Sequence, residues 1–332
     1  DGSLEVKNGT LTDLLDIALR NIGREDTNIF NKIINSFRGS YRALTNFNFI
    51  SKSKKNVAHH YDLNENLYKL FLDDDMQYSC AYFHNENINL NQAQLDKKKH
   101  IINKLQIQPD MNVLDIGCGW GGMCLQIAKD TGANVKGITL SENQLETAKK
   151  RAYIEGLNDK VQFELKDYRN ENKKYDRIVS VGMFEHVGKP FYKTYFNKIH
   201  ELLSDDGIAV VHTIGNIRTP KLTPAFIRKY IFPGGYIPSL SEIMPAIERS
   251  GLIISDIEVL RLHYAKTLSH WFQNFKNSKD EVLKLYDERF IRMWEAYLNL
   301  SELSFIKGEN VIFQLVLTKK RDSFPLVRKK IN

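Results

Sequence analysis

The sequence predicts an α/β fold built on a mostly parallel sheet with an antiparallel edge strand, preceded by N-terminal helices. From about Asn91 onward, short apolar segments alternate with helix-like stretches. One of these segments runs directly into a glycine-rich loop, Gly117–Gly122. A last β-branched segment, Val311–Thr318, follows one long helix-like stretch. Strands that alternate with helices are connected by right-handed crossovers and lie parallel, whereas the last segment is free to pair antiparallel.

Five apolar segments have the length and composition of buried parallel strands. They are Val113–Ile116, Val135–Thr139, Val161–Leu165, Ile178–Val181 and Ile208–Ile214. The long stretch Lys279–Phe305 is expected to be helical, and Val311–Thr318 after it to supply the antiparallel edge.

The first part of the chain has helical apolar spacing instead. The stripe Leu11–Leu19 follows Thr10 and Thr12, either of which is a suitable N-cap, and a second stripe runs from Ile29 to Leu44. The polar, basic residues 49–55 are typical of a linker. We therefore divide the chain into an N-terminal helical segment and linker (1–55), a main domain (56–320) and a basic tail (321–332). Because the chain begins with Asp1 rather than Met, we expect segment 1–55 to be the remnant of a larger N-terminal domain.

Composition excludes some classes of protein. With 42% hydrophobic and 26% charged residues, the chain is not intrinsically disordered. Three cysteines are too few for a disulfide framework and favour a reducing, cytoplasmic setting. No apolar run approaches the ~20 residues of a spanning helix. The residues from Lys319 to Lys330 supply +5 of the net charge of +7, which suits an anionic membrane or nucleic acid, or else a solvated terminus.

The glycine-rich loop is the sharpest local signal. Gly117, Gly119 and Gly122 fit the dinucleotide-binding pattern, but that reading needs an acidic residue about 20 positions later, which is missing after Thr139. Asp115 inside the preceding strand suits a cationic or amine-bearing ligand such as S-adenosylmethionine. The pattern D-x-G-x-G-x-G resembles the loop of class I methyltransferases, which have a Rossmann-like fold. We rank S-adenosylmethionine first, a nicotinamide or flavin cofactor second, and a purely structural turn last.

Six further motifs extend this resemblance over most of the chain. They are Ala58–Asp62 (AHHYD), Met76–Phe83 (MQYSCAYF), Met183–Gly188 (MFEHVG), His212–Gly215 (HTIG), Tyr230–Ser239 (YIFPGGYIPS) and His263–Leu268 (HYAKTL). In this order around the loop, they resemble the cyclopropane-fatty-acyl-phospholipid synthase family, which includes the mycolic acid cyclopropane synthases. Asp1–Asn21 similarly resembles the end of the extra N-terminal domain of its phospholipid-type members.

The resemblance implies that 56–320 is a catalytic domain. Members of the family transfer a methylene from S-adenosylmethionine to a cis double bond of an acyl chain. The alkene attacks the sulfonium methyl, and a base then removes a proton so that the ring closes. Bound bicarbonate is the implied base, and no metal is implied. The residues implied to bind bicarbonate combine hydrogen-bond donors with one carboxylate. They are Cys80, Glu185, His212, the backbone of Ile214 and Tyr264.

The resemblance also implies the residues that bind S-adenosylmethionine. Gln144 is expected to reach the ribose, and Asp167 the adenine amino group. The full set is Tyr78, Ser79, Asp115, Gly117, Cys118, Gly119, Trp120, Gly121, Thr139, Leu140, Ser141, Gln144, Asp167 and Tyr168.

Several alternatives remain at this stage. Cys80, His212 and Tyr264 are residue types that also occur as ordinary core residues. Many family members carry a cysteine in the late helix where this chain has Ser301, so a thiol nucleophile there is excluded if the alignment holds. A sister activity would add a plain methyl group to a lipid or an amine. A nucleic-acid methyltransferase is disfavoured, because no accessory RNA-binding motif accompanies the basic tail.

The expected partner is an unsaturated phospholipid in a bilayer, met by peripheral association at the inner, cytoplasmic face of the membrane. Two segments combine apolar and basic residues suitable for that contact, Ala225–Pro238 and Asn28–Leu44. We expect no nucleic-acid partner. The oligomeric state stays open, with a homodimer as one option.

Overall fold

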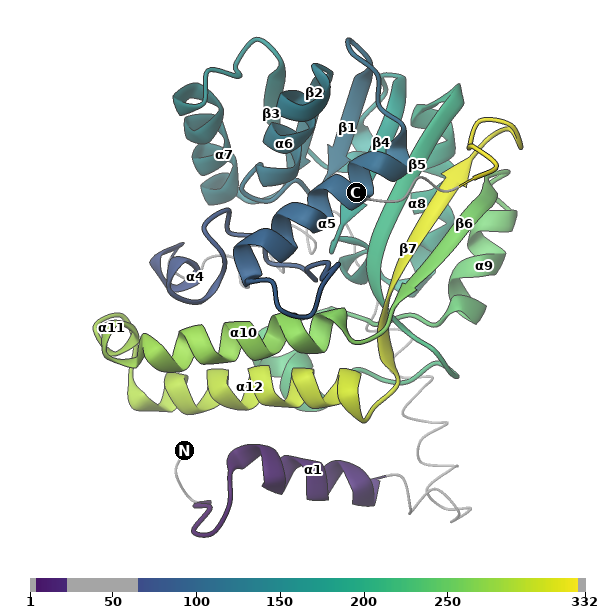
Figure 1. Cartoon of the computed structure of the whole chain (residues 1–332). Helices are drawn as coiled ribbons and strands as arrows, with labels where there is room; N and C mark the ends of the chain where they lie inside the picture. The colour runs from purple at the N-terminus through teal and green to yellow at the C-terminus, as the bar shows by residue number, and fades with distance from the viewer. Residues whose placement is uncertain (1–3, 23–64, 328–332) are drawn as a thin grey trace.

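The computed structural model describes residues 4–22 and 65–327. Within these ranges the chain forms a seven-stranded sheet with the order β3-β2-β1-β4-β5-β7-β6 (Figure 1). The pairs from β3 to β5 are all parallel, whereas β7 is antiparallel to both of its neighbours. The α/β class and the mostly parallel sheet with an antiparallel edge region are therefore confirmed.

The five expected parallel strands are all present, and their observed ends lie close to the expected ones. The bounds are Asn112–Ile116 for β1, Asn134–Thr139 for β2, Val161–Leu165 for β3, Tyr175–Val181 for β4 and Leu203–Asn216 for β5. Alternate residues of these strands point to opposite faces: Val113 packs in one buried cluster, and Leu114 in another.

The antiparallel edge contains one strand more than the sequence patterns indicated. The expected strand is β7 (Asn310–Thr318), but it lies one place in from the edge, because β6 (Ile253–Leu260) pairs along its outer side. Residues of β6 are mostly half-buried, whereas nearly all of β7 is buried. The strand with the clearest β pattern is thus the covered one.

Helices cover both faces of the sheet and one of its ends. One face packs against α5 (Leu90–Leu105), α6 (Gly122–Thr131) and α7 (Glu142–Ile154), and the other against α8 (Tyr192–Leu202) and α9 (Leu240–Glu248). The helices α10 (His263–Asn277) and α12 (Glu288–Ile306) run across the carboxyl ends of the parallel strands (Figure 1). With α4 (Glu65–Phe71) they form a third buried cluster. This layer closes the end of the sheet where α/β folds bind their ligands.

The N-terminal helix α1 (Leu11–Ile22) confirms the first expected helical stripe. Thr10 is its N-cap, since the Asp13 backbone N–H donates to the Thr10 hydroxyl at 3.2 Å, and Asp13 Oδ2 accepts from the Thr10 backbone N–H at 2.8 Å. Thr12 instead donates to Asn299 Oδ1 of α12 at 2.6 Å, which ties α1 to the helical layer.

Some expectations fall elsewhere. The stripe 29–44, the linker 49–55 and the motif 58–62 lie outside the described residues. The expected single helix 279–305 is divided into α11 (Lys279–Leu283) and α12, with Asp287 as the N-cap of α12. Among the described helices, none combines the length and the apolar character needed to cross a membrane.

Candidate active site

Two cavities meet at the carboxyl ends of the parallel strands. The first lies over β1, β2 and the loop after β4, and it is lined by polar and apolar groups. The second is predominantly apolar, has a volume of about 310 Å³, and lies between the ends of β4 and β5 and the helices α10 and α12. The residues that line both cavities are Tyr78, Ser79, Gly182 and His186. Ligands in the two cavities would therefore touch each other at this junction.

The glycine loop forms the floor of the first cavity because three of its residues have positive φ. The φ angles of Gly117, Gly119 and Gly121 are 84°, 54° and 86°. The backbone N–H groups of Gly117 and Cys118 donate to the Ile138 carbonyl at 2.9 and 3.1 Å, which anchors the loop to β2. A Cβ atom on Gly119 would meet no protein atom within 4 Å, whereas one on Gly117 would collide with Met183. Gly119 is thus the glycine that leaves room for a ligand.

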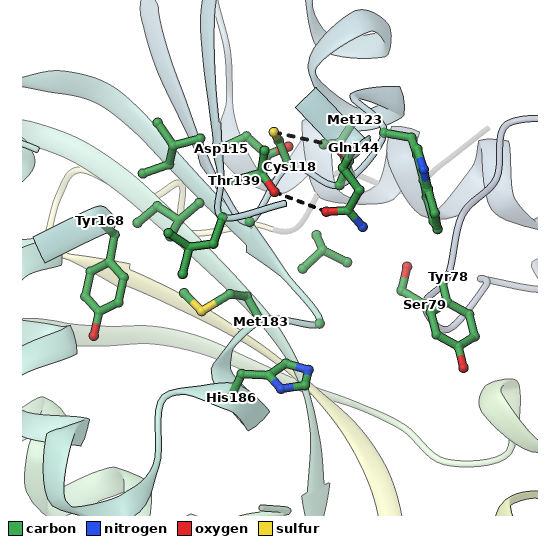
Figure 2. A pocket seen from close by; sticks show the side chains of 18 of the residues that line it. Tyr78, Ser79, Asp115, Cys118, Met123, Thr139, Gln144, Tyr168, Met183 and His186 are labelled. Carbon is green, nitrogen blue, oxygen red and sulfur yellow. Dashed lines mark hydrogen bonds between the residues drawn. The ribbon is translucent and has the colours of Figure 1, made fainter. Parts of the chain in front are cut away.

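Most of the residues expected to bind S-adenosylmethionine line this cavity, and their role in binding stays a prediction. The lining includes Tyr78, Ser79, Asp115, Gly117, Cys118, Gly119, Trp120, Thr139, Leu140, Gln144, Asp167 and Tyr168 (Figure 2). The two expected residues outside the lining have structural contacts. Ser141 caps α7 by accepting from the Gln144 N–H at 3.3 Å, and Gly121 packs against Phe163 at the start of α6.

The acidic and amide groups of the first cavity are held in place. Asp115 is 2% exposed and accepts from the Cys124 thiol at 3.3 Å, and burial raises its pKa to about 7. Gln144 Oε1 accepts from the Thr139 hydroxyl at 3.1 Å, which leaves the amide NH₂ of Gln144 to face the cavity (Figure 2). Asp167, at the opposite wall, is clamped by Arg169 at 2.6 and 2.8 Å.

The sequence patterns missed the residues that hold Gln77 and Ser79. Lys97 of α5 is fully buried, and its ammonium donates to Ser79 Oγ at 2.8 Å and to Gln77 Oε1 at 2.6 Å. Gln94 donates to the Ser79 carbonyl at 2.9 Å. Burial lowers the pKa of Lys97 to about 8. A lysine-rich helix is normally assigned to the surface, so the only available signal was its proximity in sequence to the MQYSCAYF motif.

The second cavity brings together all five residues expected to act in catalysis. Cys80, Glu185, His212, Ile214 and Tyr264 line it, although they come from four separate segments of the chain. Glu185 lies in the short turn 184–186 after β4, and His212 and Ile214 lie on β5. The fold therefore gathers this set at one place, while the role of each residue stays a prediction.

Glu185 has one oxygen fixed and one without a partner. Its Oε1 accepts from the Ile214 N–H at 2.6 Å, and no described residue hydrogen-bonds to its Oε2. Burial raises the pKa of Glu185 to about 7. The Ile214 N–H, which the sequence assigned to an anion, here positions the carboxylate.

His212 is the second group with an unpartnered polar atom. It is 1% exposed, its Nδ1 lies 3.1 Å from Gln314 Nε2, and its Nε2 has no partner among the described residues. Burial lowers the pKa of His212 well below its usual value, so the ring is neutral. At the same cavity, burial also lowers the pKa of His186 to about 4. Both rings are therefore uncharged near neutral pH.

Cys80 and Tyr264 complete the wall of the second cavity. Cys80 donates its thiol proton to the Ala81 carbonyl at 3.2 Å, and burial raises its pKa, so it stays a thiol. The Tyr264 ring packs against Trp271 and Phe305 with centroid distances of 5.7 and 5.0 Å. Both side chains belong to a buried apolar cluster and line the cavity as well. Cys80 and Tyr264 can therefore be both core residues and part of the candidate site.

The segment 225–238 forms part of the cavity wall. Phe226, Ile227 and Phe232 line the second cavity, and Ile231 is buried. Tyr230 is exposed, with the Lys229 ammonium 4.8 Å from its ring centroid. Only part of the expected apolar surface of this segment is therefore available to a partner. Ser301, which stands where many relatives have cysteine, also lines this cavity.

The sheet order, the glycine loop after β1 and the cavity at the strand ends define the class I methyltransferase fold. Coclaurine N-methyltransferase has the same fold, with a TM-score of 0.76 at 20% identity over 93% of this chain and 94% of that one. The cyclopropane synthase MmaA2 of Mycobacterium tuberculosis matches with a TM-score of 0.76 at 32% identity, covering 80% of this chain and 97% of that chain.

Sequence comparison identifies the family. The family model described as mycolic acid cyclopropane synthetase matches residues 50–315. The cyclopropane-fatty-acyl-phospholipid synthase of Escherichia coli K12 is 41% identical over 82% of this chain and 70% of its own length. A probable fatty acid methyltransferase of Pseudomonas putida is 40% identical over 79% of this chain and 68% of its own length. The chain belongs to the cyclopropane synthase family of one-carbon transferases.

Proposed function

We propose that the protein transfers a methylene from S-adenosylmethionine to a cis double bond of an unsaturated phospholipid acyl chain and forms a cyclopropane ring. The observation that carries the proposal is the junction of the two cavities. The glycine-loop cavity and the apolar cavity share Tyr78, Ser79, Gly182 and His186, and the unpartnered atoms of Glu185 and His212 lie in the apolar one.

The first cavity suits S-adenosylmethionine on several grounds. Its floor at Gly119 is open, its end carries the buried carboxyl of Asp115, and the Gln144 amide faces it. A related mycolic acid cyclopropane synthase, CmaA1, 32% identical, has been solved with S-adenosylhomocysteine and CTAB. A carboxylate and oriented amides are suited to an amino-acid ammonium group and a ribose.

The second cavity suits an acyl chain and a small anion at its inner end. Its wall is mainly aromatic and aliphatic, which accepts an alkyl chain, and it keeps water away from a poorly nucleophilic alkene. Its two unpartnered polar atoms, Glu185 Oε2 and His212 Nε2, fit bicarbonate, which both donates and accepts hydrogen bonds. Bound there, bicarbonate would supply the base for the proton that leaves the transferred carbon.

The residues of this chain then have defined tasks. The junction orients the alkene toward the sulfonium methyl, and such positioning accounts for a large part of the rate enhancement in group transfer. Aromatic faces of Tyr78, Phe232 and Tyr264 line the space where positive charge develops on the alkene. The Glu185 carboxylate, with a pKa of about 7, is able to take up a proton near neutral pH.

The substrate reaches the second cavity from a bilayer surface, in our proposal. Ile217, Leu222 and Tyr230 are 57%, 43% and 43% exposed, and they flank the residues of 223–227 that line the cavity. Lys221 and Lys229 are exposed in the same segment. This combination fits peripheral binding to anionic phospholipid, at the cytoplasmic face if the reducing setting inferred from the free cysteines holds.

One experiment tests the proposal as a whole. The protein is incubated with S-adenosylmethionine and monounsaturated phospholipid vesicles, and the lipids are analysed by mass and by proton spectra. We expect one added CH₂, loss of the vinyl signal and appearance of cyclopropyl signals. The name of the Pseudomonas putida relative favours a second candidate, plain methyl transfer to the acyl chain. A product with a methyl branch and no cyclopropyl signal would support that candidate and contradict ring formation.

A further inference from the structure

A chain of hydrogen bonds runs from His212 of β5 across β7 to the edge strand β6, on the face of the sheet that α5 covers. The Lys104 ammonium, on α5, contacts Glu258 Oε2 of β6 at 2.5 Å and donates to Gln314 Oε1 of β7 at 2.6 Å. Gln314 Nε2 lies 3.1 Å from His212 Nδ1. Gln314 is 0% exposed and Lys104 is 7% exposed, so water does not compete for these bonds.

The direction of each bond follows from the chemistry of Lys104. An ammonium group only donates, so the oxygen of the Gln314 amide must face it. The NH₂ of Gln314 must then face His212, which forces Nδ1 of the ring to accept. A neutral imidazole that accepts at Nδ1 carries its proton on Nε2. Nε2 is the ring nitrogen with no partner among the described residues.

The ring is kept neutral by its surroundings. Its burial and the nearby ammonium groups of Lys97 and Lys104 disfavour a second proton, and they outweigh the opposite effect of Glu258. Glu258 is itself engaged by Lys104 and by His100 Nε2, each at 2.5 Å. These contacts reduce the electrostatic effect of the Glu258 carboxylate on the His212 ring.

We propose that Lys104 and Gln314 are positioning residues that hold His212 in the tautomer with the proton on Nε2, so that the ring is a fixed hydrogen-bond donor into the apolar cavity. The proposal rests on the proposed function only for the purpose of this donor, which is to orient the bound anion. The opposite tautomer would place a lone pair at Nε2, so the ring could no longer donate a hydrogen bond to an oxygen of that anion. Neither residue lines either of the two cavities described above, so we expect them to act on the site through His212.

The test reads the tautomer directly. Protein labelled with ¹⁵N-histidine is examined by long-range ¹H–¹⁵N correlation, and the His212 signals are assigned as those lost in His212→Asn. We expect a bare Nδ1 and a protonated Nε2 in the unmodified protein. In Gln314→Glu the carboxylate accepts from Nδ1, so Nδ1 should become protonated. In Lys104→Met the amide is free to turn, so both tautomers should appear, whereas Lys104→Arg should restore the original signals.

Turnover provides the second measurement. Gln314→Glu should lower kcat by about 100-fold, the usual effect of losing one oriented donor, with an unchanged KM for S-adenosylmethionine. Gln126→Glu makes the same change of charge on α6, where the Gln126 side chain donates to Asp130 and lines neither cavity, and it should alter neither signals nor turnover. A protonated Nδ1 in the unmodified protein, or an unchanged tautomer in both Gln314→Glu and Lys104→Met, overturns the proposal. Because the spectra need no catalysis, a protein that makes another product would still show the tautomer.

Discussion

The backbone N–H of Ile214 donates to Oε1 of Glu185 across 2.6 Å, which joins the central strand β5 to the turn that follows β4. The bond holds the carboxylate by a rigid backbone group instead of a mobile side chain, and it leaves Oε2 without a hydrogen-bond partner among the described residues. A carboxylate held in this way loses little further conformational entropy when a ligand binds. The two strands thus fix the position of the carboxylate to which the proposed function assigns proton uptake.

Gly119→Ala is expected to prevent S-adenosylmethionine from binding while the fold is kept. A Cβ there meets no protein atom within 4 Å, so it would occupy ligand space. Calorimetric titration should show at least about a tenfold loss of affinity, since the clash falls at the closest approach of the backbone. Gly156→Ala is the matched control, because Gly156 has φ of 67° and an equally open surrounding but lies after α7, away from both cavities. Equal affinities for the two variants would refute the assignment of the loop.

Glu185→Gln and Tyr264→Phe should each reduce turnover by about two orders of magnitude, because each removes proton transfer or anion placement at the reacting centre. Binding of S-adenosylmethionine should persist, since neither residue lines the first cavity. Removing bicarbonate from the buffer should slow the unmodified enzyme and have much less effect on these variants. Tyr175→Phe, a buried tyrosine at the opposite end of β4, serves as the control. Near-normal turnover in both site variants would show that the catalytic base does not lie at this site.

The stability of the protein should carry a pH signature of Glu185. Its pKa is about 7 in the folded protein and about 4.5 in the unfolded chain, because burial disfavours the charge. Between these values only the folded protein binds the proton, so the contribution of Glu185 to the free energy of unfolding is lost as pH rises from 4.5 to 7. The loss amounts to about 3 kcal/mol, at ~1.4 kcal/mol per pKa unit.

Urea denaturation of Glu185→Gln measures this loss. Relative to the unmodified protein, the variant should gain about 2–3 kcal/mol between pH 5 and pH 8. Asp115, whose pKa is also raised to about 7, is present in both proteins and cancels in the difference. A stability difference that is constant over this range would show that the buried carboxyl does not titrate as described.

Vesicle binding should depend on the charge of the segment 217–230. Each basic side chain near an anionic surface contributes about 1 kcal/mol, screened within ~10 Å by physiological salt. Lys221→Glu and Lys229→Glu should therefore each weaken sedimentation with anionic vesicles by about tenfold. Lys160→Glu is the control: like Lys221 it pairs with one carboxylate, at 2.9 Å against 2.7 Å, but it lies at the amino end of β3. If binding does not change with these substitutions, with lipid charge or with salt, the electrostatic contribution is refuted. Purely apolar docking or delivery of the substrate by a carrier would then be the explanation.

The sequence was sufficient for the parallel part of the sheet because its strands are short segments rich in apolar residues, as in Ile208–Val211 of β5. It was insufficient for β6, in which Asp256 and Glu258 interrupt the apolar pattern of a half-buried strand. The candidate catalytic set was available only through family resemblance, since nothing local connects Cys80 with Tyr264. The support of the site could not be predicted either: Lys97 and Lys104 are buried by tertiary pairing, against the strong tendency of lysine to remain exposed.

The two cavities share only a narrow set of residues, and this has a consequence for divergence. With the proposed occupants, a substitution at Ser301 or Phe305 would reshape the space for the acyl chain without touching the methyl donor, and one at Gln144 would do the reverse. Substitutions in the lining of the second cavity could therefore change the preferred chain length, the preferred double-bond position and even the fate of the transferred carbon. The lining of the first cavity, which would bind the donor of that carbon, could stay the same. A partition of this kind allows one scaffold to serve many lipids.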